Sequence, residues 1–229
     1  MKDINRRTLL GLLGAVPLAG GLLTQVSARG TAGTSSPFGA SGKSSRELLA
    51  ERSFPNVALI THEGKKVKFY DDLIKNKIVI FNFMYAKCEG VCPGVTMNLA
   101  RVQKLLAPRV GRDIFMYSIT LKPETDTPKI LADYARMHHA GPGWTFLTGK
   151  PEDIELLRVR QGFTNPDPVL DADKSQHIGM IRFGNEPMQW WAGCPGLANP
   201  KFMVKEIGLV LGNTVWPQDA PQATKGGQK

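Results

Sequence analysis

The chain has 229 residues, 42% of them hydrophobic, which is enough to build the core of one ordinary domain. Three cysteines are too few for a small protein held together by disulfides, and no apolar run reaches the roughly 18 residues of a membrane span. The formal net charge of +9 is scattered along the chain. Because no basic stripe is interleaved with aromatic residues, we expect no nucleic-acid binding. A weak attraction to an anionic membrane surface or an acidic partner stays open.

Residues 1–28 have the order of an export signal: basic residues, then an apolar stretch, then Val26-Ser27-Ala28 before a cleavage site. The adjacent Arg6 and Arg7 resemble a twin-arginine signal. The alternative is an anchor helix that is not cleaved. Both interpretations predict a domain in the periplasm, either released or anchored to the inner membrane.

Three segments are expected after the signal. Residues 29–49 are mostly Gly, Ser, Thr and Ala at their start, which predicts a flexible linker. Residues 50–216 are the right length for one domain. Residues 217–229 are polar, which predicts a disordered tail.

Strand and helix patterns alternate within residues 50–216. The expected elements, in chain order, are a hairpin over 57–69, a helical turn over 70–74, a buried strand over 78–85, an amphipathic helix over 95–106, a strand over 114–121, a helix from 128, a strand over 144–147, a helix over 151–160, a hairpin over 177–192 and a helix from 200. Strands that alternate with helices of 10 to 15 residues predict a mainly parallel sheet. The order resembles the thioredoxin superfamily. We therefore expect a three-layer α/β/α fold with a mostly parallel central sheet, an N-terminal hairpin and a closing β-hairpin.

Cys88 and Cys92 lie between the first buried strand and the amphipathic helix, where open α/β sheets place their sites. The helix N-terminus favours thiolate over thiol, and Lys87 adds to this. Two thiols at this spacing can form a disulfide or hold one metal ion together. The pair therefore predicts a redox or metal site, with a purely structural disulfide as the alternative.

A wider set of motifs resembles the Sco/SenC family of copper-delivery proteins. The resemblance covers about 150 residues and rests on Phe69-Tyr70-Asp71-Asp72-Leu73, Asn82-Phe83-Met84-Tyr85, Cys88-x3-Cys92-Pro93, Ser118-Ile119-Thr120-Leu121-Lys122-Pro123-Glu124-x-Asp126-Thr127-Pro128 and Trp144-x-Phe146-Leu147-Thr148-Gly149. It implies assembly of the dinuclear copper centre of cytochrome c oxidase, by copper transfer, by reduction of the target's cysteines, or by both. The implied partners are the copper-centre subunit of the oxidase and a thioredoxin-like reductant or another copper chaperone.

The resemblance also implies a copper site made of two Cys and one His. We assign the ligands as Cys88, Cys92 and His177, because His177 begins the closing hairpin, which faces the cysteine turn in thioredoxin-like folds. Soft thiolates select Cu(I), and imidazole is compatible with Cu(I) and Cu(II). Asp171 and Asp173 are candidates for orienting His177. The other three histidines, His62, His138 and His139, are expected to be solvated or capping residues.

Two other function classes stay open. In a thiol–disulfide oxidoreductase, Cys88 attacks, Cys92 resolves and His177 is dispensable. A thiol peroxidase is the weakest candidate because no peroxidatic motif is visible. Cys194 is a third thiol, and we expect it to be inert or weakly reactive; as a fourth ligand it would instead suit zinc.

Overall fold

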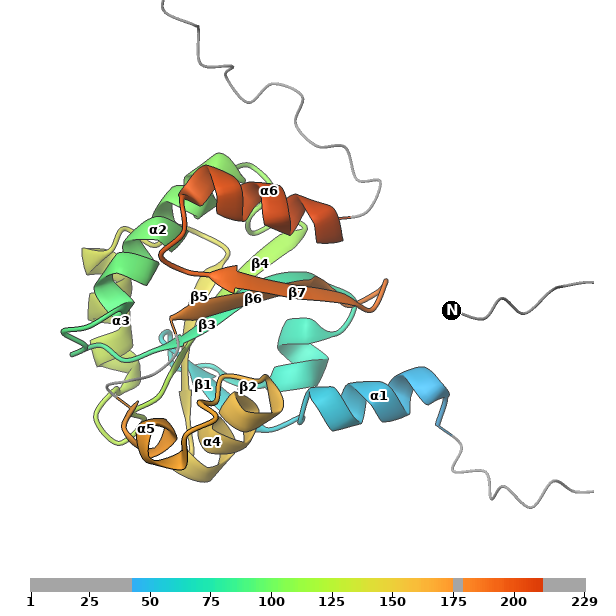
Figure 1. The fold of residues 1–229 in the computed structure, drawn as a ribbon, viewed down its shortest axis with the longest axis horizontal. Helices are drawn as coiled ribbons and strands as arrows, with labels where there is room; N and C mark the ends of the chain where they lie inside the picture. Colours follow the sequence, from blue (N-terminus) through green and yellow to red (C-terminus); the bar gives the residue numbers. More distant parts are fainter. Residues whose placement is uncertain (1–42, 175–178, 212–229) are drawn as a thin grey trace, which may run out of the picture. The chain divides into compact units, whose positions relative to one another are not determined.

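The computed structural model describes residues 43–174 and 179–211. Within them one sheet of seven strands has the order β2-β1-β5-β4-β3-β6-β7 (Figure 1). The strands are β1 (Ala58–Thr61), β2 (Lys66–Lys68), β3 (Ile78–Met84), β4 (Ile114–Thr120), β5 (Trp144–Gly149), β6 (Met180–Asn185) and β7 (Trp190–Pro195). The expected alternation of strands and helices is confirmed.

The parallel part of the sheet is its centre, where β3 pairs with β4 and β4 with β5. Both expected hairpins are present, as β1–β2 and β6–β7, and they join the centre through antiparallel pairings of β1 with β5 and β6 with β3. The sheet as a whole is therefore mixed. The connections explain the parallel centre and the two hairpins, because βαβ crossovers give parallel neighbours while short turns can give only antiparallel ones.

Helices cover both faces of the sheet and make the three expected layers. They are α1 (Ser45–Ser53), the π-helical turn η1 (Phe69–Ile74), α2 (Cys92–Leu105), α3 (Pro128–Met137), α4 (Pro151–Arg160), α5 (Pro168–Ala172) and α6 (Pro200–Val210). Helices α2 and α6 pack together on one face, and α1 and α4 lie on the other (Figure 1). No helix within the described residues is long and apolar enough to cross a membrane.

Helix α1 begins inside the segment expected to be a flexible linker. The Ser44 side chain accepts a hydrogen bond from the Glu47 backbone N–H, and the Glu47 carboxylate accepts one from the Ser44 N–H (2.6 Å). This reciprocal cap stabilises the first turn. Arg46 then ties the helix to the buried carboxylate of Glu186 in the β6–β7 turn (3.1 Å). The expected linker boundary at residue 49 is therefore too late in the chain.

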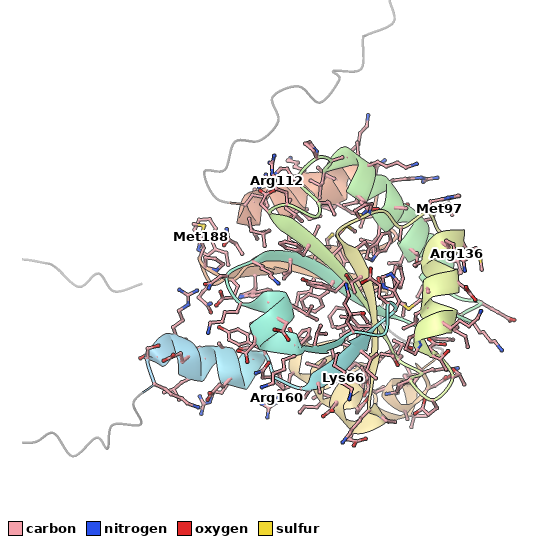
Figure 2. All side chains as sticks on the ribbon, turned by 180° about the vertical axis from the view of Figure 1, so that it is seen from behind. Lys66, Met97, Arg112, Arg136, Arg160 and Met188 are labelled. Carbon is pink, nitrogen blue, oxygen red and sulfur yellow. The ribbon has the colours of Figure 1, made fainter. Side chains whose placement is uncertain are left out.

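The core lies on both sides of β3, whose residues after Ile78 are all buried. Phe81 packs edge-on against Phe69, with ring centroids 6.2 Å apart. The one polar residue of β3, Asn82, accepts a hydrogen bond from the Ser118 hydroxyl (2.7 Å), which itself accepts one from the Trp144 indole (3.0 Å). Side chains fill the interior, whereas Met97 and Arg136 point outward from α2 and α3 (Figure 2). This rigid centre fixes the end of β3, where the cysteine loop begins.

Candidate functional site

The two predicted site cysteines lie at the junction between β3 and α2. Cys88 follows the strand by four residues, and its N–H donates to the Tyr85 carbonyl (3.2 Å). Cys92 is the first residue of α2, and Val91 before it, the N-cap residue, has no side chain that can accept a hydrogen bond from the helix start. The exposed fractions are 6% for Cys88 and 1% for Cys92, and no disulfide joins them. The predicted placement at a helix N-terminus is confirmed.

The two thiols differ in acidity. Burial raises the pKa of Cys88, but hydrogen bonds to its sulfur from the Cys92 side chain and backbone, the Tyr85 hydroxyl and the Gly90 backbone together outweigh burial and hold its pKa below the ordinary range. Burial, followed by the hydrogen bond with Cys88, raises the pKa of Cys92 far above its ordinary value. When the pair has lost one proton, the thiolate is therefore on Cys88 and the remaining proton is on Cys92.

Tyr85 lies beside Cys88, and the Lys122 side chain lies over the Tyr85 ring. Burial, together with the hydrogen bond to Cys88 and the nearby negative charges of Cys88, Cys92 and Asp173, raises the pKa of Tyr85 to about 12. The Lys122 ammonium lies 4.2 Å from the centre of the Tyr85 ring. The tyrosine therefore stays protonated at neutral pH and acts as a hydrogen-bond donor to the Cys88 thiolate.

A buried carboxylate fixes the start of the cysteine loop. Asp126 is 2% exposed and accepts hydrogen bonds from the Ala86 backbone N–H (2.9 Å) and the Thr120 hydroxyl (2.6 Å). Thr120 is the last residue of β4, the strand next to β3, and Asp126 lies in the loop that follows β4. Sequence reasoning did not assign Asp126 a role. The signal was available, because Asp126 is the aspartate of the Pro-Glu-x-Asp-Thr-Pro motif.

Helix α2 is held from two further directions. The Thr96 and Tyr134 hydroxyls share a hydrogen bond of 3.0 Å, which joins α2 to α3. The Asn98 side chain donates to the carbonyls of Gly196 and Ala198, both at 3.0 Å, so the loop after β7 lies along the helix. Cys92 is therefore carried on a helix with little freedom to shift.

Of the other predicted site residues, His177 lies in 175–178, outside the described residues. Asp171 is bound by the Arg158 guanidinium through both carboxylate oxygens (2.7 and 2.6 Å), which joins α5 to α4. Asp173 is near enough for its charge to act on Tyr85. No group of three or more His, Cys, Asp or Glu side chains gathers within 43–174 and 179–211. The three-ligand site with His177 stays a prediction.

Cys194 is not gathered with the other two thiols in the described part of the chain. It lies on β7 opposite Ile181, is 4% exposed, and has its pKa raised to about 11 by burial and by the charge of Glu206. A buried thiol with a raised pKa is a poor nucleophile, which agrees with the expectation of an inert residue. The alternative of Cys194 as a fourth ligand beside Cys88 and Cys92 is wrong.

His62 is not the solvated residue that its place in a turn predicts. Its Nδ1 accepts a hydrogen bond from the Phe146 N–H (3.1 Å), and its ring packs edge-on against the Phe146 ring. His62 is thus a structural residue that secures the hairpin to β5. His138 caps α3 and packs on Tyr134, as expected for a capping residue.

Comparison with known proteins extends the motif resemblance to most of the chain. The family model SCO1/SenC matches residues 49–207. The chain belongs to the SCO1/SenC family. Among curated relatives, it is 31% identical over 100 residues to the "SCO1 protein homolog" of Bacillus subtilis, covering 43% of this chain and 50% of the relative. It is 30% identical over 100 residues to "Protein SCO1 homolog 1, mitochondrial" of Arabidopsis thaliana, covering 44% and 29%. This SCO1/SenC chain thus spans half or less of the length of these relatives.

Solved structures of the family share the fold. A SCO1/SenC family lipoprotein from Bacillus anthracis matches with a TM-score of 0.55 and 21% identity, over 70% of this chain and 98% of that one. Yeast Sco1 with copper bound matches with a TM-score of 0.56 and 17% identity, over 73% and 97%. At these identities the likeness establishes the thioredoxin-like Sco fold, and the chemistry of this chain must be argued from its own residues.

Proposed function

We propose that this chain is a copper chaperone that binds Cu(I) through Cys88, Cys92 and His177 and serves the assembly of the dinuclear copper centre of cytochrome c oxidase. The main support is the buried pair of thiols at the start of α2, in which the pKa of Cys88 is lowered and the pKa of Cys92 is raised. Membership of the SCO1/SenC family supports copper as the metal, and relatives in this family have been solved with copper bound.

The donor set fits Cu(I) on chemical grounds. Two sulfurs and one imidazole are soft or borderline ligands, which Cu(I) prefers over oxygen donors. Three ligands leave the ion open to exchange, as a donor protein requires, whereas a structural zinc site is closed by four. Binding releases the proton that Cys92 holds, because metal-bound cysteine is a thiolate. Copper here is the cargo that is passed on.

The predicted segments place this activity in the periplasm. The order of basic, apolar and small residues in 1–28 supports a twin-arginine-like export signal or a membrane anchor ahead of the domain. We expect the copper-centre subunit of a respiratory oxidase to receive the copper. We also expect a thioredoxin-like reductant or another copper chaperone as a partner.

Anaerobic titration of the reduced protein with Cu(I), against a competing chelator, tests the ligand set. We expect one tight equivalent, lost in Cys88→Ser and in Cys92→Ser and weakened in His177→Ala. The matched control is His139→Asn, which removes an exposed imidazole, and asparagine tolerates the left-handed backbone at that position (φ 56°). Tight binding that is indifferent to His177→Ala, or equally weakened by His139→Asn, rules out the three-ligand site.

A thiol–disulfide oxidoreductase is the second candidate, favoured by the low pKa of Cys88 beside a protonated Cys92. The Cys88 thiolate attacks a disulfide of the target, a mixed disulfide forms, and one target thiolate leaves. Cys92 then loses its proton and displaces the second target thiolate, so that the target gains two electrons and Cys88 and Cys92 become a disulfide. Exchange with a model disulfide that is fast in wild type and in His177→Ala, together with weak Cu(I) binding, would make this the function.

A further inference from the structure

A cavity lies where the end of α4 meets the β6–β7 hairpin. Its volume is about 240 Å³, and its walls come from residues 161–163, 180–182 and 191–193. Cys88 and Cys92 do not line it. A site here is therefore separate from the proposed copper function and does not depend on it.

The charged group in this cavity is the guanidinium of Arg182. One of its N–H groups donates to the Gln161 carbonyl (2.9 Å), and its face lies 5.7 Å from the centre of the Trp191 ring. No acidic side chain pairs with Arg182 in the part of the chain that the structure describes. A partly buried charge without an opposite charge is costly, and an anion beside it would offset that cost.

The rest of the cavity wall is mainly apolar and firmly held. Phe163 packs on Phe83, with ring centroids 4.8 Å apart, and Trp191 packs on Phe54 at 4.4 Å. Trp191 also lies over Gly184, where an added Cβ would come within 2.2 Å of the indole ring. The indole therefore has a fixed position and can form one side of a preformed site.

Two polar atoms of the wall have no hydrogen-bond partner among the described residues. They are Gln161 Oε1 and Trp191 Nε1, both buried. Gln161 is 3% exposed, and its Nε2 donates to the Ser53 carbonyl, which fixes the direction of the amide. The wall thus holds an unpaired acceptor, an unpaired donor and a cation without a counter-charge, all beside aromatic surface.

We propose that this cavity binds a small carboxylate with an apolar body. The carboxylate pairs with Arg182, because a planar guanidinium matches two carboxylate oxygens, and the apolar body packs against Trp191 and Phe163. One cation and a largely apolar wall suit a monoanion, whereas a doubly charged phosphate would require more donors than this wall offers.

Nuclear magnetic resonance titration of the reduced protein with benzoate tests the proposal, with benzamide as the neutral ligand of the same shape and ionic strength held constant. We expect a saturable shift of the Trp191 indole N–H signal, identified by its absence in Trp191→Phe. Because a hydrogen bond to a charged group contributes about 1.5 to 3 kcal/mol, benzamide should bind at least about tenfold more weakly.

Variants on two arginines complete the test. Arg182→Gln should weaken benzoate binding by at least about tenfold, again the contribution of one charged hydrogen bond. Arg160→Gln, on an exposed arginine outside the cavity (Figure 2), should leave the affinity unchanged. If Arg182→Gln does not fold, the proposal is tested with Arg182→Lys and with the comparison of benzoate and benzamide binding in the wild-type protein. The proposal is overturned by a non-saturable shift, by equal affinity for benzamide, or by an Arg160→Gln variant that weakens binding as much as the Arg182 variant.

Discussion

The carboxylate of Asp126 accepts a hydrogen bond from the backbone N–H of Ala86, two residues before Cys88 (2.9 Å). The two residues are 40 positions apart and belong to the loops that follow β3 and β4. Because these strands are parallel neighbours, their loops leave the sheet at the same edge. Asp126 therefore sets where the cysteine loop starts.

Replacing Asp126 tests this positioning role. Asp126→Ala leaves the Ala86 N–H and the Thr120 hydroxyl buried without their acceptor, which should cost about 2 to 4 kcal/mol of unfolding free energy in urea. The alkylation rate of Cys88 should change with it, because the loop is no longer fixed. Glu124→Ala removes an exposed acid two residues away and should change neither quantity by a measurable amount. An Asp126→Ala protein with wild-type stability and alkylation rate would contradict the role.

Tyr85 should set part of the acidity of Cys88. Its hydroxyl donates to the Cys88 sulfur, and a hydrogen bond to the charged form lowers a pKa. Tyr85→Phe should therefore raise the Cys88 pKa by roughly half to one unit, as one lost hydrogen bond of about 1 kcal/mol implies. The ultraviolet absorbance of the thiolate, followed against pH in a Cys194→Ser background, measures this.

The control for Tyr85 is Tyr70→Phe, which removes a hydroxyl that donates to Glu186 (3.1 Å) and contributes nothing to the acidity of Cys88. The Cys88 pKa should stay at its wild-type value there. A Tyr85→Phe variant in which that pKa is unchanged or lower would show that the tyrosine does not stabilise the thiolate.

The Asp171–Arg158 pair should make stability depend on pH in acid. Hydrogen bonds from Arg158 and the Asn165 backbone hold the pKa of Asp171 well below its usual range. A lowered folded-state pKa means that the carboxylate stabilises the fold above its unfolded pKa of about 4, and that this contribution is lost as pH falls further. Arg158 is 4% exposed, so Asp171→Asn should cost roughly 3 kcal/mol at neutral pH.

The difference in unfolding free energy between wild type and Asp171→Asn should shrink as pH falls below about 4, because the carboxylate then becomes protonated in the unfolded chain while it is still ionised in the folded protein. Asp133→Asn is the matched control, since that carboxylate pairs with Lys129 and Arg136 at the surface, where solvent screens the interaction, and its loss should cost far less than the loss of Asp171. A cost for Asp171→Asn that stays constant from neutral pH into acid would contradict the assignment.

Glu186 should hold helix α1 on the domain. The carboxylate is 1% exposed and accepts hydrogen bonds from Arg46, the Tyr70 hydroxyl (3.1 Å) and the Asn76 N–H (2.7 Å). Glu186→Ala should cost about 3 kcal/mol, because it removes three hydrogen bonds to the buried carboxylate at about 1 kcal/mol each. Amide hydrogen exchange in α1 should accelerate more than in β3.

Arg46→Gln separates the tether from the rest of this network. The Arg46 side chain is 46% exposed, so its loss should cost only about 1 kcal/mol while still accelerating exchange in α1. Unchanged exchange of α1 in both variants would mean that other contacts hold the helix.

Most of the secondary structure was predictable because its signals are local. Pro128, Pro151 and Pro200 mark the first residues of three helices, and the apolar run of β3 marks the central strand. The Ser44–Glu47 cap of α1 carried an equally local signal that the composition of the linker obscured. Helix α5 was not predicted because it has five residues and no buried side chain.

The sequence by itself determined the place of the thiol pair. A buried strand, Cys-x3-Cys-Pro and an amphipathic helix follow one another along the chain, and short-range sterics and hydrogen bonding put both sulfurs at the helix start. Only the tertiary structure decided what surrounds them. The contacts of Ala86 with Asp126, of α1 with Glu186 and of Arg182 with Gln161 join elements that meet through strand pairing and layer packing. Such contacts depend on which elements become neighbours in space, and no local pattern in the chain specifies that.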